Sequence, residues 1–518
     1  MRIRGSSRPP TTTWRVAVSA VVIAMVAVAC TGSRSGGSTS PSASQGSAVS
    51  AAPVRFKLME FNIEYGGTQV DFDSVPKAIK ASGTDVVGIE EGYATMPKIA
   101  KALGWNYYDE RTQIVSRFPL LRPADGSQYT YVEVAPGRVV AIANEHLPSW
   151  SYGPDHVRNG MPLDKILHVE ETLRVPAVKP AIEDLAPLAA AGVPSFIMGD
   201  FNTPSHLDWT AAALRDQPDR FPVDWPVGEA VEAAGFRDSY RQLFPDPVKD
   251  PGLTWPANRP FVAGYNPYRH GDPRDRIDFI YDGGPATPVE SKIVGEGGVP
   301  GVDIVVSPWP TDHRGEVTTF EVTPAVPPVL LSADRRLITT GDAALVRYHA
   351  PGADGEHIVV VPAGGDPTTA SVADAPTTGT DGAVEVRPAS GWTAGAYDAV
   401  LLDANGQRLA ITQLWVESPG QEPVIATGKA TYGTGEPIDV TWNWAPGNRW
   451  DWLGIYRRHA GVSSYLDYIY TGATVQGTGT VAAAAEGAWP LKPGKYSVYL
   501  LRDDDYVKLA SADFTITP

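Results

Sequence analysis

The chain has 518 residues, of which 43% are apolar and 20% are charged, and it contains 47 prolines and 51 glycines. This composition excludes an intrinsically disordered chain, and the length exceeds what one hydrophobic core serves, so about two to four domains are expected. The formal net charge of −16 argues against a protein that grips a polyanion through a basic surface. It leaves open an enzyme that meets a phosphate group only at its active site.

The N-terminus has the pattern of an export signal. Arginines precede a short apolar stretch over 16–29 that ends in small residues, and this stretch is too short to cross a bilayer as a helix. We therefore predict a signal peptide over 1–29. The run from Ala27 to Cys30 resembles a bacterial lipoprotein cleavage site, which would leave a lipid on Cys30; an ordinary signal peptide with an incidental cysteine is the alternative. Either way we expect export, as a cell-surface lipoprotein or as a secreted protein.

Residues 30–53 are small and polar and show no apolar period. Such a composition predicts a flexible tether that belongs to no fold. With a lipid on Cys30, the tether would hold the rest of the protein, which we expect to be a monomer, away from the membrane surface. Cys30 is the only cysteine, so an internal disulfide is excluded.

Residues 54–323 alternate short apolar runs with amphipathic stretches, which predicts an α/β layered domain. The runs are, in chain order, VRFKLMEF, DVVGIE, VVAIAN, SFIMG, RIDFIY and VDIVVS. The amphipathic stretches include 75–81, 96–103 and 166–191. Nearly every run ends in polar side chains of catalytic type, as expected where the ends of several strands converge on one site.

In SFIMGDFNT (195–203) an apolar run ends abruptly in Asp200, Phe201 and Asn202. Residues two apart on a strand share a face, so Asp200 and Asn202 are expected to project together while Phe201 returns to the core. A buried carboxylate is costly unless something pairs with it, which points to a metal ion and a phosphate nearby.

The proline-rich TPAVPP at 323–328 marks a domain boundary, after which strand-like runs and turn residues replace the helical pattern. An internal repeat follows, since TGDAALVRYHAPG recurs as TGEPIDVTWNWAPG about one sandwich domain later. We predict two all-β sandwich modules, at 326–417 and 420–518, that bind a cell-surface ligand. The run WDWLGIYRR in the second resembles the SKICH type of immunoglobulin-like module.

The polar run ends of the α/β region supply what phosphate-ester cleavage requires. A hard divalent cation needs carboxylate and amide oxygens, and an aspartate, an amide and a histidine are needed to orient water, hold a phosphate oxygen and stabilise charge or move a proton. A carboxylate behind the histidine fixes its tautomer. The motifs are FNIEYGG with Asn62, DVVGIEEG with Glu91, NEHLPSW with His146, GDFN with Asp200 and Asn202, RIDFIY with Asp278, and TDHRGE with Asp312 and His313.

In this order the motifs resemble those of the DNase I-like endonuclease/exonuclease/phosphatase family, over 54–323. The resemblance implies an α/β four-layer sandwich of two packed sheets flanked by helices, with a metal-dependent site at one edge. It also implies that Asn62 and Glu91 bind the ion, which would be Mg²⁺ or else Mn²⁺ or Ca²⁺, and that Asp312 assists at the metal.

The same resemblance assigns the catalytic roles. Asp200 would position the nucleophilic water and Asn202 would bind a phosphate oxygen. His313, oriented by Asp278, would contact the scissile phosphate. His146 resembles a second histidine, found in DNases and sphingomyelinases, that helps to protonate the leaving group.

Two positions depart from the family pattern. Glu90 stands where glutamine usually precedes the metal glutamate, and strand alternation puts Glu91 on the face of Val87 and Ile89, so either glutamate is a candidate ligand. Glu145 precedes His146 where threonine is common, and its charge is expected to raise the pKa of a neighbouring histidine.

The resulting prediction is a secreted, divalent-metal-dependent phosphoesterase, and more specifically a phosphodiesterase because both His146 and His313 are present. Its substrate would be a nucleic acid or a phospholipid. The alternatives are a sphingomyelinase-like or inositol-phosphatase-like enzyme and, from another class, a non-catalytic surface-binding protein with a degenerate catalytic domain. Aromatic residues beside the motifs would stack on bases, rest against lipid headgroups or pack their own loops; these are Trp150, Tyr152, Trp255, Tyr265 and Tyr268. Arg269 and His270 are candidates for contact with a second phosphate.

Overall fold

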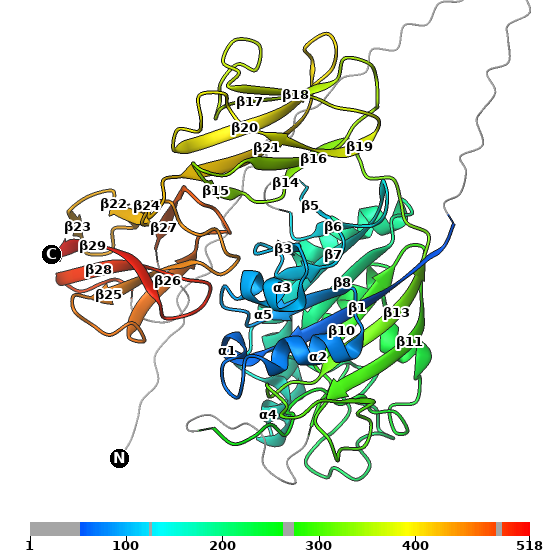
Figure 1. Ribbon diagram of the computed structural model, residues 1–518. Helices are drawn as coiled ribbons and strands as arrows, with labels where there is room; N and C mark the ends of the chain where they lie inside the picture. The colour runs from blue at the N-terminus through cyan, green and yellow to red at the C-terminus, as the bar shows by residue number, and fades with distance from the viewer. Residues whose placement is uncertain (1–51, 124–126, 263–273, 483–488) are drawn as a thin grey trace, which may run out of the picture. The chain divides into compact units, whose positions relative to one another are not determined.

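The computed structural model describes residues 52–123, 127–262, 274–482 and 489–518 (Figure 1). The expected signal peptide, Cys30 and nearly all of the tether lie outside the described residues, as do Tyr265, Tyr268, Arg269 and His270. Those expectations therefore stay predictions. Among the described residues, none of the helices combines the length and apolar character needed to cross a lipid bilayer.

The first sheet of the α/β region has seven strands. In spatial order they are β12 (Ile304–Val305), β11 (Ala286–Gly295), β13 (Gly315–Val322), β1 (Val54–Asn62), β2 (Val86–Glu90), β4 (Ile114–Ser116) and β3 (Tyr107–Asp109). β1 runs parallel to β2, with Asn62 opposite Glu90, and antiparallel to β13. This register brings the ends of β1 and β2, and the start of β13, to the same edge of the sheet.

The second sheet has six strands. In spatial order they are β5 (Leu120–Leu121), β6 (Thr130–Ala135), β7 (Arg138–His146), β8 (Ser195–Asp200), β10 (Asp278–Gly283) and β9 (Arg237–Asp238). β7 and β8 are parallel, with His146 opposite Asp200, and β10 is antiparallel to β8, with Asp278 opposite the same Asp200. Three residues singled out in the sequence therefore form one row across three neighbouring strands.

The two sheets share a hydrophobic core. Phe56 and Leu58 of β1 pack in one cluster with Ile142 of β7 and with Phe196 and Met198 of β8. Phe196 makes edge-to-face contacts with Phe56 and Phe320 in this layer, with the ring centroids of Phe196 and Phe320 4.8 Å apart. Because strand side chains alternate, each sheet has a second apolar face to cover.

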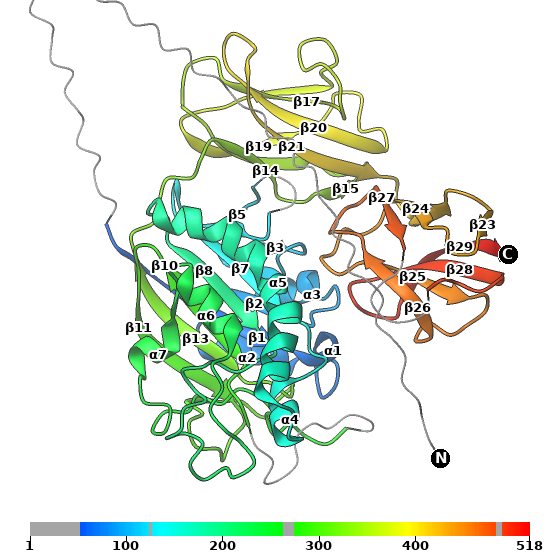
Figure 2. The same cartoon turned by 180° about the vertical axis from the view of Figure 1, so that it is seen from behind.

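Helices cover these second faces. α2 (Ser74–Ser82) and α3 (Met96–Leu103) place Val75, Ile79 and Ile99 in one cluster with residues of the first sheet. α5 (Leu163–Ala190) and α6 (Pro226–Ala233) pack on the second sheet through residues such as Leu185 and Val231 (Figure 2). The shorter helices are α1 (Glu64–Gly67), α4 (Gly153–Arg158) and α7 (Ser239–Leu243). The predicted helical stretches 75–81, 96–103 and 166–191 thus correspond closely to α2, α3 and α5, whereas VDIVVS contributes only the two-residue strand β12.

The remaining chain is built from β-strands, and its pattern repeats. The segment 330–417 forms one sheet of β14 (Leu330–Ala333), β16 (Ala344–His349) and β19 (Asp381–Val386), and another of β15 (Leu337–Thr339), β21 (Arg408–Glu417), β20 (Gly395–Leu402), β17 (His357–Pro362) and β18 (Ala373–Pro376). The segment 424–517 forms one sheet of β22 (Val424–Thr427), β24 (Ile438–Asn443) and β27 (Gly477–Val481), and another of β23 (Thr431–Gly433), β29 (Lys508–Thr517), β28 (Gly494–Leu501), β25 (Trp452–Arg457) and β26 (Tyr465–Tyr470). Each segment has its own hydrophobic core. The equal strand counts and matching pairings agree with the internal repeat of the sequence.

Candidate active site

The polar run ends of the α/β region meet at one place. Asp200, the last residue of β8, accepts a hydrogen bond from Asn62 Nδ2 to its Oδ2 atom at 3.1 Å. The same Oδ2 lies 3.6 Å from His146 Nε2 and 3.7 Å from His313 Nε2. Three motifs spread along the sequence therefore surround the carboxylate of a fourth, and this carboxylate is only 1% exposed.

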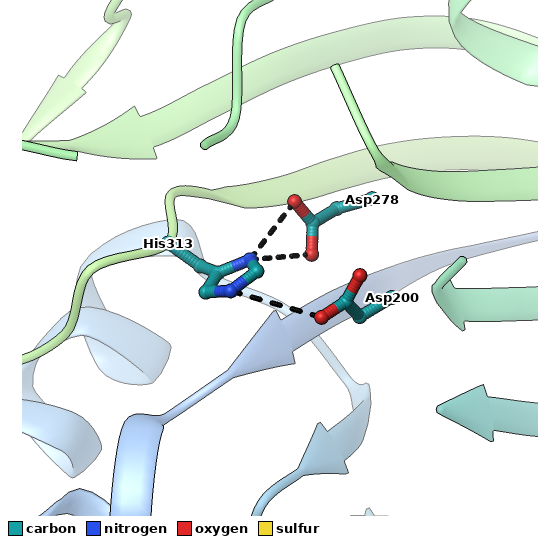
Figure 3. Close-up of side chains that lie close together, drawn as sticks. All are labelled: Asp200, Asp278 and His313. Carbon is teal, nitrogen blue, oxygen red and sulfur yellow. Dashed lines mark hydrogen bonds and ion pairs between the residues drawn. The ribbon is translucent and has the colours of Figure 1, made fainter. Parts of the chain in front are cut away.

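His313 bridges two of the carboxylates (Figure 3). Its Nδ1 lies 3.0 Å from Asp278 Oδ1, on the side opposite to the Nε2 atom that faces Asp200. Burial lowers the pKa of His313, but the charges of Asp278, Asp200 and Asp312 outweigh this effect and raise the pKa well above its usual value. An imidazolium with one N–H held by Asp278 has its second N–H, 3.7 Å from Asp200 and so beyond hydrogen-bond distance, positioned to donate toward a negatively charged substrate.

His146 is in the opposite electrostatic situation. Burial, and after it the positive charge of His313, lower the pKa of His146 to about 4. The two histidines beside Asp200 therefore differ in charge near neutral pH, with the proton on His313. The expectation that Glu145 raises the pKa of a neighbouring histidine is wrong here, because the Glu145 carboxylate is neutralised by Arg449 at 2.8 Å.

Asn202 lies beside Asp200, but not through strand alternation as the sequence suggested. β8 ends at Asp200, and Asn202 has a left-handed backbone with φ of 51°. Its side-chain Nδ2 donates to Asp200 Oδ2 at 3.2 Å and to the carbonyl oxygen of Leu147 at 3.0 Å. Phe201 is buried in the core as expected.

A group of acidic and amide side chains lies next to this cluster. Asn62 Nδ2 is 3.4 Å from Glu91 Oε1, and the Glu91 Oε2 atom accepts a hydrogen bond from the backbone of Tyr65. β2 ends at Glu90, and Glu91 adopts a left-handed backbone with φ of 53°, which takes it out of the strand alternation. Glu91 is partly exposed beside Asn62, whereas Glu90 is fully buried, and burial raises the pKa of Glu90 to about 7.

These residues fit a hard divalent cation. Glu64, Glu91 and Asp312 lie close enough that their charges repel. Burial raises the pKa of Asp312, the positive charge of His313 opposes this rise, and the charge of Glu91 adds to it. Burial is also the main reason that the pKa of Glu64 rises to about 7. Carboxylate and amide oxygens are the donors that such an ion prefers, and its charge would relieve this repulsion.

Asp200, Asp278 and His313 also offer ligand atoms that lie within 4.8 Å of one another, so this buried acidic and histidine group is geometrically able to hold an ion. The raised pKa of His313 opposes that assignment, because a histidine must be neutral to bind a metal. Asn62, Glu91 and Asp312 stay the predicted ligands; in this structure Asn62 presents Nδ2 to Glu91, while its Oδ1 accepts the backbone N–H of Glu64 at 3.0 Å.

Sequence reasoning missed two of the residues that hold this part of the site, Glu64 and Arg259, and it did not assign Trp255 a bond to Asp312. Arg259 Nη2 donates to Glu64 Oε1 at 2.6 Å in a buried ion pair, and Glu64 Oε2 accepts the backbone N–H of Asp312 at 3.1 Å. Trp255 Nε1 donates to Asp312 Oδ2 at 3.2 Å. Glu64 lies inside the motif FNIEYGG, so its position next to Asn62 could have identified it as a site residue. No pattern in the sequence pointed to Arg259.

The aromatic residues of the flanking loops divide into two groups. Tyr152 packs edge-to-face on Trp255 with ring centroids 5.4 Å apart, and its hydroxyl donates to Asp275. These two rings therefore pack against each other beside the site. Trp150, at 57% exposure, is accessible to a ligand.

Comparisons with known proteins identify the family of the α/β region. Residues 59–313 match the model of the endonuclease/exonuclease/phosphatase family. An uncharacterized protein of Caenorhabditis elegans is 31% identical over 261 residues, which make up 45% of this chain and 80% of that protein.

Solved structures with similarity to the chain include an endonuclease/exonuclease/phosphatase from Beutenbergia cavernae (16% identity, 70% of this chain and 99% of that chain, TM-score 0.33). Others are a 3'-5' exonuclease from Neisseria meningitidis (15%, 51% and 98%, 0.31) and a mannosyl-6-phosphatase from Bacteroides thetaiotaomicron (13%, 51% and 99%, 0.31). The family match, together with the extent of the identity to the C. elegans protein, shows that this chain belongs to the endonuclease/exonuclease/phosphatase family.

Proposed function

We propose that the protein is a secreted, divalent-metal-dependent phosphodiesterase. Members of its family hydrolyse phosphate esters, as nucleases or phosphatases. The observation that carries the proposal is the convergence of Asn62, His146 and His313 on Asp200, with Asp278 behind His313. A degenerate, non-catalytic domain would not be expected to keep this buried set of charges, because each is costly without a function or a partner.

Asn62, Glu91 and Asp312 would hold the metal ion, and Mg²⁺ is the ion we propose first. When bound, the ion neutralises charge on the non-bridging oxygens of the phosphate and polarises a water molecule. Arg259 and Trp255 keep Glu64 and Asp312 in place for this role through the hydrogen bonds described above.

Asp200 would accept the proton of the attacking water as the water oxygen forms its bond to phosphorus. His313 donates from Nε2 to a non-bridging oxygen, because Asp278 holds its other nitrogen. The bond from phosphorus to the leaving oxygen breaks, and that oxygen takes a proton from His146. The negative charge of a bound phosphodiester raises the pKa of His146 from its low value in the free site, which allows this transfer.

We propose a phosphodiester rather than a monoester substrate because two histidines of different charge face Asp200. The charged His313 is suited to stabilising charge on the phosphate, and His146 would protonate an alkoxide leaving group once the bound substrate has raised its pKa. Nucleic acid and phospholipid diesters both carry this bond, and a sphingomyelinase-like or inositol-phosphatase-like activity is the alternative within the same chemistry.

The wider organisation of the protein is also part of the proposal. We propose a four-layer α/β sandwich over 54–323 and two immunoglobulin-like β-sandwich modules at 326–417 and 420–518, which are supported by the shared core of the first two sheets and by the repeated strand pattern. Export with a lipid on Cys30 would place a monomeric enzyme at the cell surface, where the modules bind their ligand.

A substrate panel tests the function. Plasmid DNA, single-stranded DNA, RNA, sphingomyelin, phosphatidylinositol and bis(4-nitrophenyl) phosphate are each incubated with the protein, with Mg²⁺ or Mn²⁺ and with EDTA. We expect metal-dependent cleavage of at least one diester, which Asp200→Ala abolishes. Activity in Asp200→Ala equal to that of the wild type would show that the assigned site is wrong.

A further inference from the structure

Glu145 is an unusual residue for its position. It lies on β7 next to His146, its side chain is only 5% exposed, and it carries a carboxylate. Gly199 on β8 lies opposite it, and a Cβ atom at Gly199 would meet the Glu145 carbonyl oxygen at 1.8 Å, so the two strands are tightly apposed here. Burial raises the pKa of Glu145, and Arg449 opposes this effect. A buried carboxylate in such a place requires a partner.

The partner comes from the segment 424–517. Arg449 Nη2 lies 2.8 Å from Glu145 Oε2, and Nη1 donates to the carbonyl oxygen of Asn144. Arg449 therefore bonds to both the side chain of Glu145 and the backbone carbonyl of Asn144, two residues before His146. The guanidinium is 10% exposed, so it is committed to this contact.

Neighbouring residues fix the same loop, which lies between β24 and β25. The backbone N–H of Arg449 donates to the carbonyl oxygen of Glu110 at 3.2 Å. The indole N–H of Trp450 donates to Gln113 Oε1 at 3.3 Å. Backbone, guanidinium and indole groups of two consecutive residues thus all bond to the α/β region.

A cleft of about 870 Å³ opens beside this contact. Its lining includes Tyr65 and His146 from the α/β region, and Trp450, Tyr468 and Tyr470 from the segment 424–517. The rings of Trp450 and Tyr470 pack edge-to-face 5.0 Å apart, and Tyr468 packs on Tyr470 at 5.5 Å. Since His146 lines the cleft, the part of a substrate that extends into it is the part on the leaving-group side.

The charges of the cleft favour an uncharged occupant. Its three arginines already have acidic partners: Arg111 lies 4.0 Å from Asp109, Arg336 interacts with the charge of the same Asp109, and Arg449 pairs with Glu145. A polyanionic strand gains affinity from cations that pair with its phosphates, and these cations are engaged elsewhere. Aromatic side chains bind planar rings by stacking, whatever substituents the rings carry.

We propose that the loop carrying Arg449 and Trp450 completes the active site. Arg449 is a positioning residue that fixes His146 through Glu145, and Trp450 with Tyr470 binds an uncharged ring in the leaving group of a phosphodiester. This inference rests on the proposed function and deepens it, because it assigns a ligand class to the leaving-group side of the same site.

The positioning role is tested with Arg449→Met, Arg449→Lys and, as a matched control, Arg458→Met, which removes an exposed arginine paired with Asp513 in the same segment. The substrates are diphenyl phosphate and dibutyl phosphate, with the released alcohol measured by chromatography. Arg449→Met is expected to lower kcat about 10- to 100-fold, with the larger loss for dibutyl phosphate, because an alkoxide depends more on a placed proton donor than a phenoxide does. Arg449→Lys restores part of this loss, and Arg458→Met retains wild-type kinetics.

The ring site is tested with Trp450→Ala. This change is expected to raise KM about tenfold for diphenyl phosphate while KM for dibutyl phosphate stays near that of the wild type. Thermal unfolding of each variant shows whether it is folded, and the comparison of the two substrates on one variant remains informative if its stability falls.

The outcomes separate this inference from the proposed function. An active wild type whose Arg449→Met variant keeps full kcat on both substrates, or whose Trp450→Ala variant raises both KM values equally, overturns this inference alone. A wild type that cleaves no diester under any metal condition overturns both.

Discussion

The carboxylate of Asp278 holds the ring of His313 by one nitrogen, with Nδ1 lying 3.0 Å from Oδ1 and 3.1 Å from Oδ2. Asp278 begins β10 and His313 lies just before β13, so the pair joins the two sheets. The charge of Asp278 is also the largest influence that keeps His313 protonated against the effect of burial. Orientation and charge of the histidine thus depend on the same side chain.

Asp278→Asn is therefore expected to lower kcat by about 10²- to 10⁴-fold while the fold is kept. The amide preserves the shape of the carboxylate but lowers the pKa of His313. Asp282→Asn is the matched control, since Asp282 is a buried aspartate on the same strand whose partners are Arg237 and Ser239. Wild-type kcat in Asp278→Asn, measured on the best diester of the panel, would contradict the role of this pair.

The low pKa of His146 has a consequence for stability. The unfolded chain protonates this histidine below about pH 6.5, whereas the folded protein does so only below about pH 4. The unfolded state therefore binds one more proton within this window, and stability falls as the pH falls through it. His146→Asn removes this contribution.

We expect urea unfolding to show a smaller loss of stability between about pH 7 and pH 5 for His146→Asn than for the wild type. The other titrating groups are common to both proteins and cancel in the comparison. Equal losses in the two proteins would mean that His146 is not neutral in the folded state at these pH values.

The crowding of Glu64, Glu91 and Asp312 predicts that a bound cation stabilises the protein. Millimolar Mg²⁺ or Mn²⁺ should raise the Tm, and EDTA should reverse the shift.

Glu91→Gln should weaken metal affinity at least about tenfold, measured by titration calorimetry. Glu90→Gln is the control and should bind metal as the wild type does, because Glu90 is fully buried. Loss of binding in Glu90→Gln alone would reverse the assignment.

The buried ion pair of Arg259 and Glu64 makes a prediction about stability. Arg259→Met leaves the Glu64 carboxylate buried without its partner and is expected to cost about 3–5 kcal/mol. Arg55→Met removes an exposed ion pair with Glu321 and should cost about 0–1 kcal/mol. The two are compared by urea unfolding in the presence of EDTA. Similar small losses in both variants would show that Glu64 is neutralised in another way.

The sequence predicts the strand ends well because the apolar runs stop where polar residues begin. Asp200, Asp278 and His146 lie at strand ends in the structure, and parallel or antiparallel register then brings them together. Local backbone geometry at the ends was less predictable. Glu91 and Asn202 both leave their strands through left-handed backbone conformations, which strand alternation does not anticipate.

The partners of buried charges were the least predictable part of the site. Arg259 lies 195 positions from Glu64, and Arg449 lies 304 positions from Glu145. Charge pairs at such separations depend on the complete fold, and a single sequence contains many arginines that are equally plausible. The departure of Glu145 from the family pattern is explained only once Arg449 is seen beside it.

Hydrolysis in ¹⁸O-labelled water, with wild type and Asp200→Asn compared on the best diester of the panel, tests the central claim most directly. We predict that the wild type places the label in the phosphate product and leaves the alcohol unlabelled, and that Asp200→Asn lowers the rate at least about 100-fold. Label in the alcohol, or an Asp200→Asn rate equal to that of the wild type, would contradict water attack on phosphorus at Asp200.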